Sequence, residues 1–137
     1  MKKILVIENE RMVFLDIKKT FEKSGYEVVF GNIQNIVSLF SSAEVPELII
    51  LDVWTMVHMN GLLKFSLSTY SKFKGVPVIL TSSSQKGTFR FCMTNKITVI
   101  GELYKPYASS ELVEMYLQYK NDSAFENEFV QFVLSSH

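Results

Sequence analysis

The sequence predicts a doubly wound α/β fold, with a five-stranded parallel sheet and helices on both of its faces. Short apolar runs alternate with amphipathic segments of helical length five times along the chain, and such strict alternation favours a parallel sheet. The 137 residues, 47% of them hydrophobic, are enough for one domain with a full core. We expect strands at residues 3–8, 26–30, 47–52, 77–81 and 97–103.

Helices are expected to follow these strands, at residues 10–24, 33–43, 60–73, 84–95 and 109–120. Gly25 follows the first of them as a helix C-terminal glycine, and four apolar residues share one face of this helix: Val13, Phe14, Ile17 and Phe21. The segment 84–95 is predicted to be a weak helix, because Gly87, Thr88 and Thr94 favour helix poorly.

The last segment, residues 121–137, is expected to extend a domain that covers residues 1–120. Asn121 and Asp122 are predicted to break the last helix, and Ser123 then begins a capping-box pattern. The apolar residues that follow share one face of a short helix: Phe125, Phe129, Phe132 and Val133. This helix either packs on its own domain or docks on a partner, which includes a second copy of the chain.

Composition and charge exclude several classes of protein. The 14 basic and 14 acidic residues cancel, so no basic excess points to nucleic acid. The apolar runs are strand-sized, far short of the roughly 20 residues that a membrane helix needs. Cys92 is the single cysteine, so no intrachain disulfide can form, which fits a reducing cytoplasm.

Polar residues stand where four of the predicted strands end. Glu8 ends the first strand and Asn9 follows it, Asp52 ends the third, Thr81 ends the fourth, and Lys105 lies just past the fifth. Ligands of open parallel sheets bind outside the carboxyl ends of the strands. Carboxylates, a hydroxyl and an ammonium gathered there indicate a site for a metal ion and a phosphoryl group. Taken alone, Asp52 has the alternative role of capping a helix or turn.

In their order and spacing, these residues resemble the receiver domain of two-component response regulators, over about residues 3–119. The resemblance implies the flavodoxin-like strand order 2-1-3-4-5 and a stand-alone receiver similar to chemotaxis regulators. It implies no enzyme activity beyond the receiver's own phosphorylation and slow dephosphorylation. Its phosphoryl donor would be a histidine kinase or a phosphotransfer protein.

The resemblance also implies a role for each polar residue. Asp52 aligns with the phosphoacceptor, and Lys105, which precedes Pro106, aligns with the lysine that pairs with phosphoryl oxygens. Thr81 aligns with the switch hydroxyl and Ser82 with a small residue beside the site. The magnesium ligands would come from Glu8, Asn9, Asp52 and the backbone carbonyl of Trp54.

Three departures from the family pattern qualify these roles. Asn9 stands where an aspartate is usual, so we expect weak magnesium binding. Glu102 stands where an aromatic is usual, and Tyr104 is expected to point to the other face of the strand, so the usual coupling to the threonine is expected to be absent. Met56 replaces a proline, which predicts a mobile loop after Asp52. The ring of Trp54 either covers the site or is a half-exposed loop side chain.

Two functions follow. In the first, phosphorylation of Asp52 switches a partner face formed by residues 84–119, where Phe91, Glu102 and Tyr104 would meet a downstream protein or a second copy of the chain. In the second, the chain is a pseudo-receiver that binds partners without phosphate. Phosphoryl uptake and magnesium affinity separate the two.

Overall fold

The fold was analysed in a computed structural model that describes residues 2–32, 34–41, 44–58, 75–83 and 98–135. Five parallel strands form one sheet in the order β2-β1-β3-β4-β5, which confirms the predicted fold class and strand order. Each predicted strand lies within one residue of the observed one at both ends: β1 Lys3–Ile7, β2 Glu27–Gly31, β3 Leu48–Asp52, β4 Pro77–Ser82 and β5 Thr98–Tyr104. The described helices are α1 Arg11–Glu22, α2 Ile36–Ser41, α3 Val53–His58 and α6 Ser109–Ser135.

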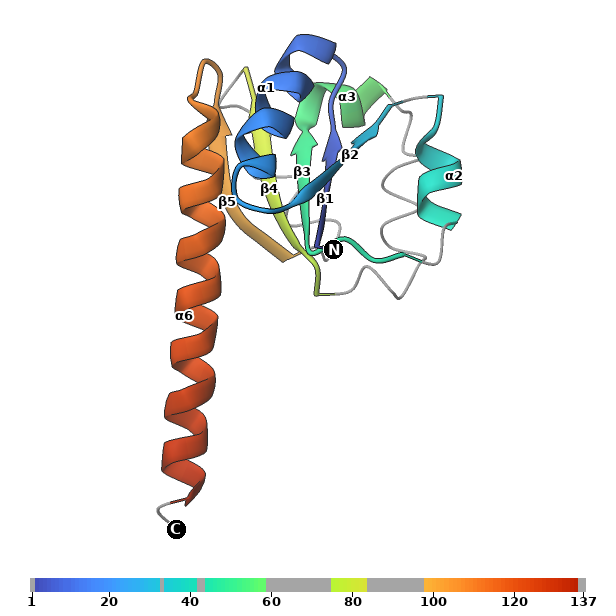
Figure 1. Cartoon of the computed structure of the whole chain (residues 1–137). Helices are drawn as coiled ribbons and strands as arrows, with labels where there is room; N and C mark the ends of the chain where they lie inside the picture. The colour runs from blue at the N-terminus through green and yellow to red at the C-terminus, as the bar shows by residue number, and fades with distance from the viewer. Residues whose placement is uncertain (1, 33, 42–43, 59–74, 84–97, 136–137) are drawn as a thin grey trace.

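The central strands are buried on both faces of the sheet, and alternate residues of each strand point to opposite sides. Every residue of β3 and β4 is buried. One set of apolar strand side chains packs with Ile36 of α2, and the other set packs with α1 and α6 through Phe14, Ile17 and Leu112. Figure 1 shows α1 and α6 on one side of the sheet and α2 on the other.

Helix α1 has the predicted buried face, with Phe14, Ile17 and Phe21 inside the core. It is followed by Gly25, whose φ of +88° is a left-handed conformation that side chains other than glycine rarely adopt. The Tyr26 N–H donates to the Phe21 carbonyl across this turn. The predicted glycine stop and the following strand are therefore confirmed.

The segment after β3 was predicted to be a loop, and this prediction was wrong for residues 53–58. They form α3, and the Asp52 carboxylate accepts the N–H of Thr55 at its first turn. An aspartate that accepts the N–H three residues on stabilises a helix start. The alternative role of Asp52 as a helix cap is thus present in the structure.

The predicted break at Asn121 and Asp122 was also wrong, because α6 runs without interruption from Ser109 to Ser135. The Gln118 amide donates to the Asp122 carboxylate four residues on, at 3.0 Å, which is a normal helical pairing. Asn and Asp cost little inside a helix compared with glycine or proline. Figure 1 shows α6 continuing well past the sheet.

The predicted helices 60–73 and 84–95, with Phe91 and Cys92, lie outside the described residues. Within the described ranges, none of the helices combines the length and the apolar character needed to cross a membrane.

Candidate functional site

The strand order brings the predicted polar residues to one edge of the sheet. β3 lies between β1 and β4, and Asp52 is the register partner of Thr81. Glu8 comes directly after β1, whose last residue, Ile7, pairs with Leu51. Three neighbouring strands thus place a glutamate, an aspartate and a threonine side by side.

Lys105 reaches the same edge from β5. The pairing of β5 with β4 is irregular between Val78 and Ile79, and beyond this bulge Tyr104 lies opposite Ser82. The Lys105 N–H then donates to the Ser82 carbonyl at 2.8 Å. The Lys105 ammonium lies 3.2 Å from Asp52 Oδ1 and 3.4 Å from Glu8 Oε2, so one cation bridges both carboxylates.

Glu8 is a buried carboxylate, with only 2% of its side chain exposed. Its Oε1 accepts the N–H groups of Asn9 at 2.9 Å and Glu10 at 3.2 Å. Burial raises the pKa of Glu8, and the charge of Asp52 raises it further, while Lys105 and the two N–H groups lower it in part. For Lys105, burial acts to lower the pKa, but Glu8 and Asp52 outweigh it and the pKa is raised.

Asp52 is held through both of its oxygens. Oδ2 accepts the Thr55 N–H at 2.9 Å and the Thr55 hydroxyl at 2.6 Å, while Oδ1 faces Lys105. These bonds fix the carboxylate orientation, with one oxygen toward the helix start and the other toward the ammonium. Sequence reasoning missed Thr55. The available signal was its place three residues after an aspartate, the spacing of a helix cap.

Two hydroxyls at this edge are buried without a partner. Thr81 Oγ1 and Tyr107 Oη are both inaccessible, and neither has a hydrogen-bond partner among the residues that the structure describes. Burial raises the pKa of Tyr107, and Glu8 adds to the effect. The Thr81 hydroxyl lowers the pKa of Tyr107 in part, so this hydroxyl lies near the phenol. No hydrogen bond of good geometry joins the two hydroxyls, however. Tyr107 was missed; its place two residues after Lys105 was the only signal.

The remaining predicted site residues lie around this group. Ser82 is buried and supplies the carbonyl that holds Lys105. Asn9 is exposed and contributes its backbone N–H to Glu8. Trp54 lies in the first turn of α3 with 48% of its surface exposed, so it is a half-exposed side chain on a helix rather than on a loop.

Glu102 and Tyr104 share one face of β5, so the expectation that they point to opposite faces was wrong. The Tyr104 hydroxyl donates to Glu102 Oε2 at 2.8 Å, and this bond raises the pKa of Tyr104. Residues two apart on a strand point to the same side of the sheet. Tyr104 is therefore held beside Glu102.

The side chains at this edge fit a magnesium site whose remaining ligands are oxygens of a substrate phosphate and waters. Magnesium is usually held by one or two carboxylates together with phosphate oxygens and waters. Glu8 and Asp52 are two such carboxylates, close enough for Asp52 to raise the pKa of Glu8. Across the described residues, no group of three or more acids, histidines or cysteines could hold a metal ion alone.

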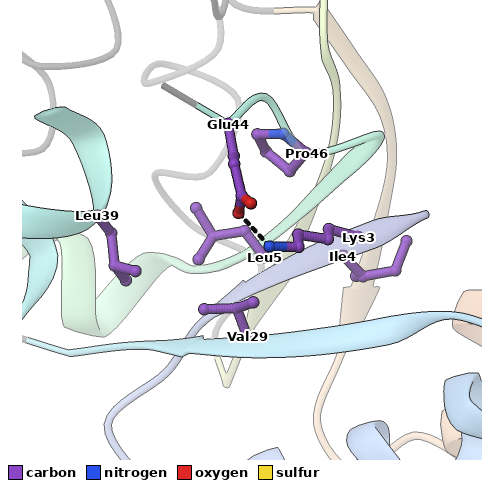
Figure 2. Close-up of a pocket in the computed structure, with 7 residues that line it drawn as sticks. All are labelled: Lys3, Ile4, Leu5, Val29, Leu39, Glu44 and Pro46. Atoms are coloured by element: carbon purple, nitrogen blue, oxygen red, sulfur yellow. Dashed lines mark hydrogen bonds and ion pairs between the residues drawn. The ribbon is translucent and has the colours of Figure 1, made fainter. Parts of the chain in front are cut away.

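A hollow lies at the opposite end of the sheet from this site, where β1 begins. Figure 2 shows it between β1, β2 and α2, with Lys3 and Glu44 paired across it. Its other lining residues are apolar: Ile4, Leu5, Val29, Leu39 and Pro46. It therefore lacks the convergent carboxylates of the carboxyl edge.

No protein-family model matches the sequence, and no curated protein matches it. Solved structures do match its fold. A signal receiver domain of a Clostridium thermocellum histidine kinase is 24% identical with a TM-score of 0.69, covering 84% of this chain and 94% of that one. The chemotaxis response regulator CheY4 of Vibrio cholerae is 18% identical with a TM-score of 0.71, covering 86% and 98%.

A third match is the N-terminal domain of a three-domain response regulator from Carboxydothermus hydrogenoformans. It is 19% identical with a TM-score of 0.68, covering 89% of this chain and 99% of that one. The chain therefore has the fold of response-regulator receiver domains, which is the fold that the strand-end residues predicted.

Proposed function

We propose that the protein is a phosphorylation-dependent signalling switch that accepts a phosphoryl group on Asp52. The observation that carries this proposal is the buried Asp52 at the end of β3, with the Lys105 ammonium 3.2 Å from its Oδ1. Phosphoryl transfer requires charge neutralisation and positioning more than covalent help from the protein. Lys105 supplies the charge neutralisation, and the hydrogen bonds from Thr55 position the Asp52 carboxylate.

The proposed roles divide among the carboxyl-edge residues. Asp52 Oδ1, the oxygen that faces Lys105, is the acceptor, and Lys105 binds oxygens of the incoming phosphoryl group. The Thr81 hydroxyl, buried and without a partner among the described residues, donates to another of these oxygens. Magnesium, held by Glu8, Asp52, the Asn9 side chain and the Trp54 carbonyl, would lower the repulsion between carboxylate and phosphate.

The proposed donor is a histidine kinase or a phosphotransfer protein, since the structures that share the fold carry names of two-component signalling proteins. The proposed downstream partner binds the face of residues 84–119, where Glu102 and Tyr104 lie on β5. We place the protein in the cytoplasm and assign it no catalytic activity on other molecules.

The pseudo-receiver is the second candidate, and one observation favours it. The two buried carboxylates already have protein partners, because Lys105 bridges them and Thr55 and two backbone N–H groups bind their other oxygens. Such a cluster pairs its charges without a bound phosphoryl group. In that case the fold would present its partner face permanently.

Fluorescence of Trp54 tests the proposal without a label, because it is the single tryptophan and lies two residues past Asp52. The protein is titrated with magnesium and then with beryllofluoride, an acyl-phosphate mimic. The switch predicts a saturable, magnesium-dependent change in the wild type that Asp52→Asn abolishes. Absence of any change at tens of millimolar magnesium, together with no phosphoryl uptake from acetyl phosphate, would leave the pseudo-receiver.

A further inference from the structure

The two unpartnered hydroxyls of Thr81 and Tyr107 carry an inference about how the site recognises a phosphoryl group. They come from separate elements, Thr81 from the end of β4 and Tyr107 from the turn after β5. Both oxygens are buried without a hydrogen-bond partner among the described residues. Buried polar groups are rarely left unpaired, and those that are often mark functional sites.

Other hydroxyls in the described structure show that the fold can satisfy such groups. Tyr104 donates to Glu102 at 2.8 Å, and Tyr116 donates to Glu47 at 3.4 Å. Ser109, two residues after Tyr107, donates to Asp16. Among the residues that the structure describes, the buried hydroxyls without a partner are therefore confined to the edge where Asp52 and Lys105 meet.

The chemistry of the two hydroxyls is complementary. Burial and the charge of Glu8 raise the pKa of Tyr107, so its phenol stays protonated and can donate one hydrogen bond. A threonine hydroxyl can accept one bond while it donates another. An oxyanion placed at Asp52 would supply the acceptor that completes such a chain.

We propose that Tyr107 is a positioning residue for the phosphoryl group, whose phenol donates to Thr81 Oγ1 when Thr81 donates to a phosphoryl oxygen on Asp52. This inference rests on the proposed function, and it adds a residue to the switch. The bound oxyanion then satisfies two buried hydroxyls at once, and hydrogen bonds in such a chain strengthen one another. Tyr107 thereby couples the turn after β5 to the state of Asp52.

The test measures beryllofluoride affinity and thermal unfolding of Tyr107→Phe, which removes only the hydroxyl. We expect affinity to fall about five- to tenfold, as for the loss of one net hydrogen bond. We expect the unliganded protein to unfold at the same or a higher temperature, because the lost hydroxyl had no partner in the described structure. If Tyr107 had only a structural role, Tyr107→Phe would lower the beryllofluoride affinity and the unfolding temperature together. Tyr116→Phe is the control, since Tyr116 is buried and its hydroxyl bonds far from Asp52.

A double-mutant cycle with Thr81→Val shows whether the two hydroxyls act as one unit. If they do, Tyr107→Phe causes no further loss of affinity once Thr81 lacks its hydroxyl. Equal affinity of Tyr107→Phe and wild type, or losses that simply add in the double variant, would overturn the role of Tyr107 while leaving the switch intact. No saturable binding by the wild type would overturn the switch and this inference together.

Discussion

Two lysine–glutamate pairs lie at the two ends of β1, and they differ in burial. Lys3 begins the strand and pairs with Glu44, whose side chain is 63% exposed, across the hollow in Figure 2. Glu8 follows the strand and pairs with Lys105, with 2% of the Glu8 side chain exposed. The same pairing chemistry is therefore a surface contact at one end and a buried network at the other.

The difference indicates that the carboxyl end of β1, rather than its amino end, belongs to a functional site. Exposed ion pairs contribute little to stability, because water screens them and the long side chains lose freedom. Buried charges are costly unless they are paired and hydrogen-bonded. At the carboxyl edge the chain pairs two buried carboxylates with one partly exposed ammonium and leaves two hydroxyls without partners among the described residues, which a stabilising core would avoid. This arrangement suits a site that receives a charged group.

The largest expected effect comes from removing each lysine in turn. Lys105→Met leaves Glu8 and Asp52 buried together without their shared cation, so we expect the free energy of unfolding to fall by roughly 3 kcal/mol. Lys3→Met, the matched control, is expected to change it little, because its partner Glu44 stays in water. Urea denaturation measures both. Equal losses of unfolding free energy in Lys105→Met and Lys3→Met would contradict the proposed difference between the two ends of β1.

A smaller effect is expected from Thr55, which binds Oδ2 of Asp52, the oxygen that faces α3. Thr55→Val removes a 2.6 Å hydrogen bond to a buried carboxylate, so we expect a loss of about 2 kcal/mol in unfolding free energy. Thr55→Ser keeps the hydroxyl and is expected to lose clearly less. The same denaturation experiment compares them. If valine were no more destabilising than serine, the hydroxyl bond to Asp52 would contribute no more than the packing of the methyl group, which would contradict this account.

The smallest effect concerns the pH dependence of stability. The pKa of Glu8 in the folded protein is raised above its usual value of 4.5, so the folded state holds this proton more tightly than the unfolded chain does. The contribution of Glu8 is fully present below pH 4.5 and declines as pH rises through the raised pKa.

The stability of wild type relative to Glu8→Gln is therefore expected to fall between acid and neutral pH, as followed by chemical denaturation across that range. Glu44→Gln is the control at the other end of β1, because the Glu44 side chain is 63% exposed. A wild-type advantage over Glu8→Gln that grows toward neutral pH would reverse the sign and contradict the account of Glu8.

Most of the fold was predictable because strand–helix alternation is a local property of the sequence. The five strands were found within one residue at each end, since each is a short apolar run next to polar residues. The errors came from side-chain pairings that composition does not show. Thr55 joins Asp52 to start α3, and Gln118 pairs with Asp122 inside α6.

The site was predictable where charge and strand ends coincide, as for Glu8, Asp52 and Lys105. The site was less predictable where a role depends on neutral side chains that the pairing of β4 with β5 brings together. Tyr107 lies beside Thr81 because β5 pairs with β4 through a bulge and then turns, which sequence spacing alone does not reveal. The error on Tyr104 had a simpler cause, since the two-residue repeat of a strand already places it with Glu102.

The most direct test of the central claim, that the carboxyl edge is built to receive a phosphoryl group, is to map that group chemically. The wild type and Asp52→Asn are incubated with acetyl phosphate and magnesium; intact masses are measured before trapping of the acyl phosphate, and peptide masses after it. We predict one added phosphoryl group per intact chain and the trapping product, which forms as phosphate leaves, on the peptide that contains Asp52, with neither in the variant. A wild type that gains no phosphoryl group, or gains it equally in Asp52→Asn, would contradict the claim.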